Sequence, residues 1–326
     1  MKPLSIAATL LLALLAVNFT GVKNLHAQTY PAGPVNLIVT MDPGSGADTA
    51  GRALAEELGK IMKSPVVVVN KPGAGSTLGA DFVVKSKKDG HTLLYATASA
   101  VVHTKVTSPE IVPFDPAKDL EPLGFHCFLP LVLVVQQDSP WKTLKDFVDH
   151  GKKNPGALRI SVASLGNIDH MNVEIIQSMT GAPPFNVIPF KAANAAVTAL
   201  LGGHVEGSLV SIPLAAPHVK AGKLRMLIVS NKHPEFPDVP TSADLGYKEN
   251  LLFSWFAVYG PAGMSEESKK VLIPAIEKAV RNPELKAKLE QLGFGVEYRS
   301  PEELRKLQLS DFAVADALAV KMGLRK

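Results

Sequence analysis

The stretch "VNLIVTMDPGSGADTAGRALAEELG", residues 35–59, joins an apolar run to a glycine-rich turn and then to a helical pattern. Its first six residues are typical of a buried β-strand, and the apolar spacing after the turn predicts a helix over 48–62. Free backbone N–H groups and the positive end of a helix dipole meet at such a turn, so the stretch predicts an anion-binding loop. We therefore take Gly44, Ser45, Gly46 and Asp48 as candidate ligand-binding residues.

The same alternation of strand and helix continues along most of the chain. A strand over 66–69 leads through "NKPGAGST" to a helix over 77–87, and a strand over 91–97 follows. The pattern restarts at residue 128 with a second set of alternating strands and helices. This order predicts an α/β fold with two units, each a mostly parallel sheet flanked by helices.

The two closing helices, over 265–292 and 301–323, need a surface to pack on, and the shortest closure returns them to the first unit. Extended segments near 124–131 and 251–258 would then connect the units. The sequence thus predicts a two-lobed clamp, in which residues 28–127 plus 254–326 form lobe 1 and residues 128–253 form lobe 2. Open α/β sheets bind ligands at the carboxyl ends of their strands, so the site is expected in the cleft between the lobes.

The N-terminus has the features of a cleavable export signal over residues 1–27. Lys2 precedes an uncharged apolar stretch, and Leu25-His26-Ala27 fits a small-residue cleavage site. The apolar stretch is shorter than the ~20 residues of a membrane-spanning helix. We expect an exported protein that begins at Gln28, and the single cysteine, Cys127, excludes an internal disulfide.

The charge balance gives no sign of a nucleic-acid or membrane-surface partner. The formal net charge is +4, and removal of Lys2 and Lys23 with the signal leaves +2, spread along the chain. We therefore predict no nucleic-acid partner.

Other loops at strand-to-helix junctions carry short polar side chains that suit a small polar ligand. Because the carboxyl ends of parallel strands meet at one edge, these loops are expected to lie together. The further candidate ligand-binding residues are Gly75, Ser76, Thr97, Ser99, Ser164, Gly166, Asn167, His170, Lys191 and Asn194.

Nucleotide and catalytic motifs are incomplete. The first loop lacks the Gly-Lys-Ser/Thr of a P-loop, and Thr49 stands where a dinucleotide loop has its third glycine. "VASLG" resembles a nucleophile elbow around Ser164, but Val162 replaces its first glycine. The histidines show no metal-ligand spacing. We predict no catalytic residue, no cofactor and no metal, with a hydrolase on the same scaffold as a remote alternative.

Several blocks resemble the extracytoplasmic solute receptors of tripartite tricarboxylate transporters, often called Bug receptors. The blocks are "DPGSGADTAGRALA", "VVVVNKPGAGSTLGADFV", "KDGHTLLYAT", "PFDPAKDLEPLG", "VIPFKAANAAVTALLGGHVEG" and "PDVPTSADLGY". The resemblance implies a two-lobed periplasmic clamp that binds small carboxylates through loop backbone and hydroxyl groups.

On this basis we expect a monomeric periplasmic receptor that captures a small carboxylate, closes by hinge motion and delivers its ligand to membrane transporter subunits. A receptor without a transporter, which presents its closed form to a membrane sensor, is the alternative. The sequence leaves the choice between these partners, and the identity of the ligand, open.

Overall fold

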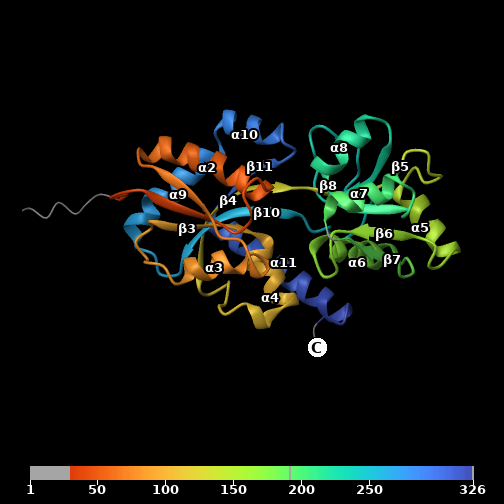
Figure 1. The fold of residues 1–326 in the computed structure, drawn as a ribbon, viewed down its shortest axis with the longest axis horizontal. Helices are drawn as coiled ribbons and strands as arrows, with labels where there is room; N and C mark the ends of the chain where they lie inside the picture. The colour runs from red at the N-terminus through yellow and green to blue at the C-terminus, as the bar shows by residue number, and fades with distance from the viewer. Residues whose placement is uncertain (1–29, 191, 325–326) are drawn as a thin grey trace, which may run out of the picture.

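The computed structural model describes residues 30–190 and 192–324, and the predicted signal segment lies outside them. Two β-sheets lie next to each other along the long axis of the molecule, and helices cover both faces of each (Figure 1). We call the first sheet with its helices the first lobe and the second sheet with its helices the second lobe. The predicted α/β clamp fold is confirmed.

The first sheet has six strands in the order β11-β4-β10-β3-β1-β2. β1 is parallel to β2 and β3, whereas β10 is antiparallel to its neighbours β3 and β4, and β11 is antiparallel to β4. The central strands are mostly buried: β1 is rich in valine, isoleucine and leucine, and β4 and β10 add aromatic side chains, as expected for strands covered on both faces. The strands are β1 Val35–Val39, β2 Val66–Asn70, β3 Thr92–Thr97, β4 Leu120–Leu129, β10 Ser254–Pro261 and β11 Gly295–Arg299.

The second sheet has five strands in the order β7-β6-β8-β5-β9. β6 is parallel to β7 and β8, whereas β5 is antiparallel to β8 and β9. The strands are β5 Leu131–Gln136, β6 Arg159–Val162, β7 Asn186–Pro189, β8 Gly207–Ser211 and β9 Leu224–Val229.

Both sheets are therefore mixed, which corrects the expectation of mostly parallel sheets. The reason is the path of the chain between the lobes. β4 runs toward the second lobe and continues through Pro130 into β5, and β10 brings the chain back between β3 and β4. A strand that returns across the same boundary must run opposite to one that leaves. The remaining parallel strands, β1 to β3 and β6 to β8, still direct their carboxyl ends toward the other lobe.

The helices form two layers on each sheet. In the first lobe α2, α9 and α10 cover one face, and α3, α4 and α11 cover the other (Figure 1). In the second lobe α7 and α8 pack opposite α5 and α6. The helices are α2 Gly46–Met62, α3 Thr77–Val84, α4 Thr104–Thr107, α5 Leu144–Lys153, α6 Ile168–Thr180, α7 Ala193–Leu201, α8 Ile212–Lys220, α9 Glu266–Val280, α10 Pro283–Glu290 and α11 Pro301–Lys321, with short turns η1 Ala74–Ser76, η2 Ser99–His103 and η3 Pro109–Ile111.

Helix boundaries follow the capping chemistry of the sequence. The side chain of Ser45 accepts a hydrogen bond from the N–H of Asp48 at the start of α2, and Asn167 does the same for His170 in α6. Thr143 and Ser300 form complete capping boxes at the starts of α5 and α11. Asn282 followed by Pro283 ends the single helix predicted over 265–292 and begins α10.

Contacts besides the strand crossings hold the second lobe against the first lobe and against the segment that returns to it. The buried amide of Asn172 in α6 exchanges two hydrogen bonds with the backbone of Leu252, at 2.7 and 2.8 Å. The ammonium of Lys321, at the end of α11, lies 3.3 Å from the carboxylate of Glu174 in α6. An added Cβ at Gly166 would lie 3.2 Å from the Cδ1 atom of Leu324. The end of the last helix therefore touches the second lobe.

The core of the first lobe holds the single cysteine. Cys127 is fully buried on β4, and its Sγ lies 3.5 Å from the hydroxyl of Tyr95. Burial raises the pKa of the thiol to about 12. Cys127 is thus an unreactive packing residue at neutral pH.

Candidate functional site

A cavity of about 460 Å³ lies between the lobes, where the carboxyl ends of the two sets of parallel strands face each other. Its first-lobe wall consists of the end of β1 with Met41 and Asp42, the loop 72–76 after β2, and the segment 99–111. Its second-lobe wall is the loop 164–168 between β6 and α6. This is the position at which open α/β sheets bind ligands.

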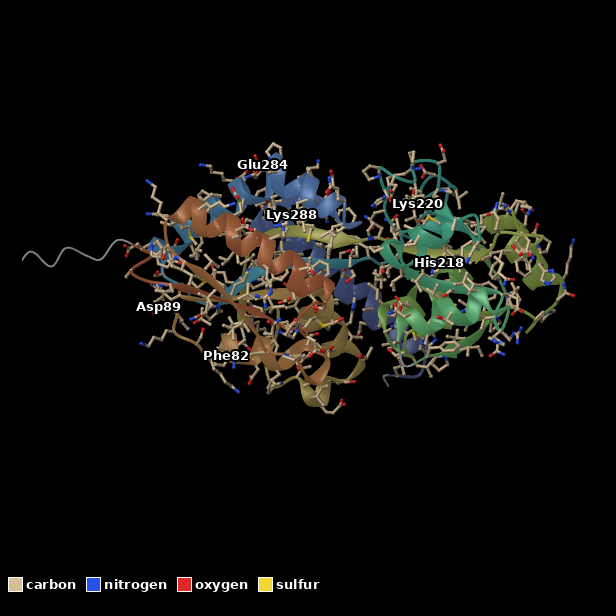
Figure 2. The ribbon with its side chains drawn as sticks, turned by 45° about the horizontal axis from the view of Figure 1, so that its top comes forward. Phe82, Asp89, His218, Lys220, Glu284 and Lys288 are labelled. Atoms are coloured by element: carbon tan, nitrogen blue, oxygen red, sulfur yellow. The ribbon has the colours of Figure 1, made fainter. Side chains whose placement is uncertain are left out.

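A larger groove of about 630 Å³ lies on another flank of the molecule, between α8 and the turn after α10. Figure 2 shows Lys220 on α8 and Lys288 on α10, the two helices on either side of this groove. Lys220 forms an ion pair with Glu235, which also lines the groove. Ile212 and Pro213, which follow β8, reach this groove, but none of the described ligand-binding residues predicted from the sequence lines it, whereas six of them line the 460 Å³ cavity. We therefore place the candidate site in the 460 Å³ cavity.

The loop 73–76 has an unusual backbone. All four of its residues have positive φ angles, including the non-glycine residues Ala74 (47°) and Ser76 (75°). The surrounding structure holds this conformation: the Thr104 hydroxyl donates a 2.7 Å hydrogen bond to the carbonyl of Gly75, and the Thr77 hydroxyl donates to the carbonyl of Ala74 at 2.6 Å. Such strain persists only where the fold enforces it, and it is concentrated at functional sites.

The first glycine loop is stabilised from within by Asp48. Its carboxylate accepts hydrogen bonds from the N–H of Gly44 at 2.9 Å, from the Arg52 guanidinium at 3.0 Å and from the Asn70 amide at 2.8 Å. Burial of Asp48 raises the pKa of this carboxyl, but the hydrogen bonds from Arg52, Gly44 and Asn70 outweigh it and lower the pKa to about 2. Asp48 thus stays charged and holds the loop.

The second-lobe wall is a helix N-terminus. Asn167 caps α6, and the N–H of Gly166 donates a 3.0 Å hydrogen bond to Nδ1 of His170. Asp169 is buried, and its carboxylate accepts a hydrogen bond from the amide of Asn167 at 3.0 Å. Burial raises the pKa of Asp169 to about 6, against the lowering effect of the hydrogen bonds from Asn167 and from the backbone of Ala163.

The structure brings some of the predicted residues together at the cavity. Those that line it are Gly75, Ser76, Ser99, Ser164, Gly166 and Asn167. Of the others, Gly44, Ser45 and Asp48 build the loop that follows the lining residues Met41 and Asp42.

The remaining predicted residues lie around the cavity rather than in its wall. Gly46 faces Leu129 and Phe294, and the hydroxyl of Thr97 accepts a hydrogen bond from the N–H of Ala100. His170 contacts the backbone of the lining residue Gly166, and Asn194 is exposed on α7. Lys191 lies outside the described residues.

Several cavity residues were missed by the sequence reasoning. The first loop contributes its early part, Thr40 to Asp42, instead of its glycines, and the segment after β3 contributes His103, Thr104, Thr107, Ser108 and Ile111. The signal for the second group was their helical spacing after Ser99. Burial lowers the pKa of His103 to about 4, so its imidazole is neutral at neutral pH.

The site carries donors but little positive charge. Among the described residues that line it there is no lysine or arginine, and Asp42 is the acidic one. Two cations of the described first-lobe loops are engaged elsewhere: Arg52 binds Asp48, and the ammonium of Lys71 lies 4.3 Å from the ring centre of Phe82. The starts of α3 and α6 both border the cavity, and each helix N-terminus acts as roughly half a positive charge.

Within the described residues, Ser164 has no catalytic partner in hydrogen-bond contact. Ser164 is exposed and no hydrogen bond joins it to a histidine, because Nδ1 of His170 is occupied by the backbone of Gly166. No cluster of three or more potential metal ligands is found within residues 30–190 and 192–324. In the same ranges, no helix is both long enough and apolar enough to cross a membrane.

A family model described as the tripartite tricarboxylate transporter family receptor matches residues 50–324. The chain belongs to this receptor family. The match confirms the resemblance seen in the sequence motifs.

Known receptors agree in sequence and in fold. The protein BugT of Bordetella pertussis is 35% identical over 260 residues, which make up 79% of each chain. A TctC solute binding protein from Polaromonas, solved with no ligand, has a TM-score of 0.81 at 28% identity, over 90% of this chain and 100% of that chain. A protein of R. palustris solved with adipate has a TM-score of 0.74 at 24% identity, over 90% and 98% of the two chains, and shares the fold.

Proposed function

We propose that this member of the tripartite tricarboxylate transporter receptor family is a periplasmic receptor that captures a small carboxylate between its lobes without chemical turnover. The observation that carries the proposal is the cavity itself. It lies at the carboxyl ends of both sheets, two helix N-termini border it, and hydroxyl and amide side chains line it.

Capture uses the two lobes as a clamp. Lobe 1 comprises residues 28–127 plus 254–326, and lobe 2 comprises residues 128–253, since the strands of the first sheet come from both ends of the chain and those of the second from its middle. Hinge rotation at the crossings near Pro130 and Leu252 closes the cavity on the ligand. The receptor acts as a monomer and hands its ligand to the membrane subunits of a tripartite tricarboxylate-type transporter.

The R. palustris protein solved with adipate supports a carboxylate as the class of ligand. The absence of a hydrogen bond between Ser164 and a histidine among the described residues supports capture rather than catalysis. Export follows from the predicted signal segment over residues 1–27.

A thermal-shift screen of mono-, di- and tricarboxylates tests the proposal. A carboxylate present at 100 times its Kd is expected to stabilise the protein by about 2.7 kcal/mol. Mass spectrometry of the ligand after incubation should show it unchanged, and the protein recovered from the periplasm should begin at Gln28. The absence of a shift with every carboxylate, or conversion of a bound compound, would refute capture of a carboxylate.

A further inference from the structure

A second cavity, of about 490 Å³, lies at the junction of the two lobes, and we call it the junction pocket. Three segments line it: α6, the middle of α11, and the segment 248–253 that returns from the second lobe. It shares no lining residue with the proposed carboxylate site. We propose that the junction pocket binds a small organic cation, a protonated amine with an apolar body, through the buried carboxylate of Asp311.

The walls of the pocket come from both lobes and from the chain between them. α11 runs from the first sheet toward the second lobe, where it contacts α6 (Figure 1). Asp311, Val314 and Leu318 line the pocket from one face of α11, as their helical spacing requires. Ile175 of α6 lines it from the second lobe. A molecule in the pocket would therefore contact both lobes at once.

Asp311 is a buried acid whose charge is incompletely compensated. It is 8% exposed, and its Oδ2 accepts a 2.7 Å hydrogen bond from Nε1 of Trp255 on β10. Burial raises the pKa of Asp311 to about 6, against the lowering effects of this hydrogen bond and of the charge of Arg299. Arg299 itself forms an ion pair with Glu297. The Asp311 carboxylate is ionised at neutral pH, and a cation beside it would stabilise that charge.

The apolar part of the wall determines the rest of the ligand. Leu252 and Leu318 are buried, and Val314 is 38% exposed, so apolar surface lies beside the carboxylate. Lys248 and Glu249 also line the pocket, but both are exposed and their charges are opposite. Desolvation of an ammonium group opposes binding, and apolar atoms of the same molecule offset this cost when they cover the wall. The cation is therefore expected to carry a hydrocarbon chain or ring.

The size and the ligand set of the pocket favour an organic cation over a metal ion. Its volume is in the range of small-molecule sites. Calcium and magnesium need several oxygen ligands, and no cluster of three or more potential metal ligands is found in the part of the chain that the structure describes. A single buried carboxylate beside apolar side chains matches one ammonium group instead.

Titration of the mature protein with three probes, followed by tryptophan fluorescence, tests the inference. Trp255 donates its hydrogen bond to Asp311, so a cation at this carboxylate should change the emission of Trp255, whereas the other tryptophan, Trp141, packs against Phe147 in the second lobe. Benzylamine is a cation at pH 7, benzyl alcohol keeps its ring without the charge, and methylamine keeps the charge without the ring. We expect benzylamine to bind with a Kd of about 1 mM or lower, and the other two at least about tenfold more weakly.

The other outcomes of this titration overturn the inference. Absence of benzylamine binding would exclude an amine site. Equal binding of benzyl alcohol would show that the carboxylate does not select a cation, and equal binding of methylamine would show that the apolar wall is not used. The carboxylate site proposed above is a different cavity, so none of these results bears on it.

A change of charge tests the role of Asp311. In Asp311→Asn the amide oxygen can still accept the hydrogen bond from Trp255, but the charge is removed, so benzylamine should bind at least about tenfold more weakly. Glu302→Gln is the matched control, because Glu302 is an exposed acid of α11 outside the pocket lining, and it should bind benzylamine as the wild type does. Wild-type affinity in Asp311→Asn would refute the assignment.

A change of volume tests the location independently. Ala317 and Ala313 are both exposed on α11, and Ala317 lines the pocket whereas Ala313 does not. Ala317→Phe should fill the pocket and weaken benzylamine binding at least about tenfold, and Ala313→Phe should leave it unchanged. Because both side chains are exposed, both variants should melt as the wild type does. Equal affinities in the two variants would show that benzylamine binds elsewhere and would overturn the inference.

Discussion

In the first lobe the wall of the cavity is the loop 73–76, in which every residue has a positive φ angle, whereas in the second lobe it is the loop 164–167, in which only Gly166 does. The loop 73–76 is held by the hydroxyl groups of Thr104 and Thr77, which lie in neighbouring turns. The second loop is held by the cap of its own helix, through Asn167 and His170. The first lobe therefore offers a fixed cradle, and the second offers an ordinary helix start that tolerates change.

α2 of the first lobe and α6 of the second each carry a buried acid in their first turn, and the environments of these two acids differ. Asp48 in α2 has three hydrogen-bond donors and a pKa lowered to about 2, whereas burial dominates at Asp169 in α6 and raises its pKa to about 6. The buried charge of Asp48 therefore stabilises the loop at Gly44 in the first lobe, whereas burial of the charge of Asp169 destabilises the second lobe.

The largest expected effect is at Gly75. Gly75→Ala would place a Cβ 2.7 Å from Oγ1 of Thr104 at a φ angle of 61°. We expect a loss of about 2–4 kcal/mol in the free energy of unfolding, the sum of left-handed strain and steric overlap, and a loss of carboxylate binding. Urea denaturation and calorimetric titration measure the two effects.

Two other glycines serve as controls for this prediction. Gly156 has a φ angle of 80° and nothing within 4 Å of an added Cβ, so Gly156→Ala should show the left-handed strain alone, about 1–2 kcal/mol. At Gly166 an added Cβ would meet the flexible side chain of Leu324 at 3.2 Å, and Gly166→Ala should fall between the two. Equal losses in all three variants would show that the first-lobe loop is no more constrained than the second.

The next effect in size is at Asp48. Its pKa is lower in the folded protein than the ordinary value of 3.8, so its contribution to stability is present above about pH 4 and is lost as the pH falls toward about 2. The loss is about 2 kcal/mol over this range. Asp48→Asn should be less stable than the wild type at pH 7 by a similar amount and should lack this acid dependence. Denaturation curves between pH 2 and 7 check it, and an unchanged acid dependence in Asp48→Asn would contradict the assignment.

The smallest effect, of opposite sign, is expected at Asp169. Because its pKa is raised in the folded protein, the folded state binds protons more tightly, and stability falls as the pH rises from about 4 to about 6. Asp169→Asn should remove this fall in stability. It should stabilise the protein at pH 7 by up to about 1–2 kcal/mol, a figure that allows for the weaker hydrogen bond from the Ala163 backbone to a neutral amide. Destabilisation at pH 7 would show that Asp169 is as well compensated as Asp48.

The sequence allowed the fold class to be predicted because the alternation of strand and helix patterns is strong. Apolar runs such as 66–69 and capping residues such as Asn167 are local signals, and local signals also indicated six of the residues that line the cavity. The direction of strand β10 and the existence of β11 could not be predicted from local signals, because both depend on where the chain returns after the second lobe.

The cavity residues that sequence reasoning missed also depend on the path of the chain and not on a local signal. His103 and Ile111 reach the cavity because the segment after β3 continues as η2, α4 and η3. The helical spacing after Ser99 indicated a helix, but it did not indicate which face of that helix meets the second lobe. The glycines at 44 and 46 predicted an anion site from the sequence. In the structure the N–H of Gly44 donates to the carboxylate of Asp48, so it stabilises the loop instead of facing the cavity. A glycine-rich turn in sequence does not reveal which way its N–H groups point.

Cys127 has a practical consequence. Its thiol is fully buried and protonated at neutral pH, so the single cysteine of the sequence presents no reactive thiol to solvent. A cysteine introduced at Lys321 or at Glu174, on opposite sides of the contact between α11 and α6, would be the single site for a thiol-reactive fluorophore. One substitution would thus give an optical probe of the contact between α11 and α6, without first removing the natural cysteine.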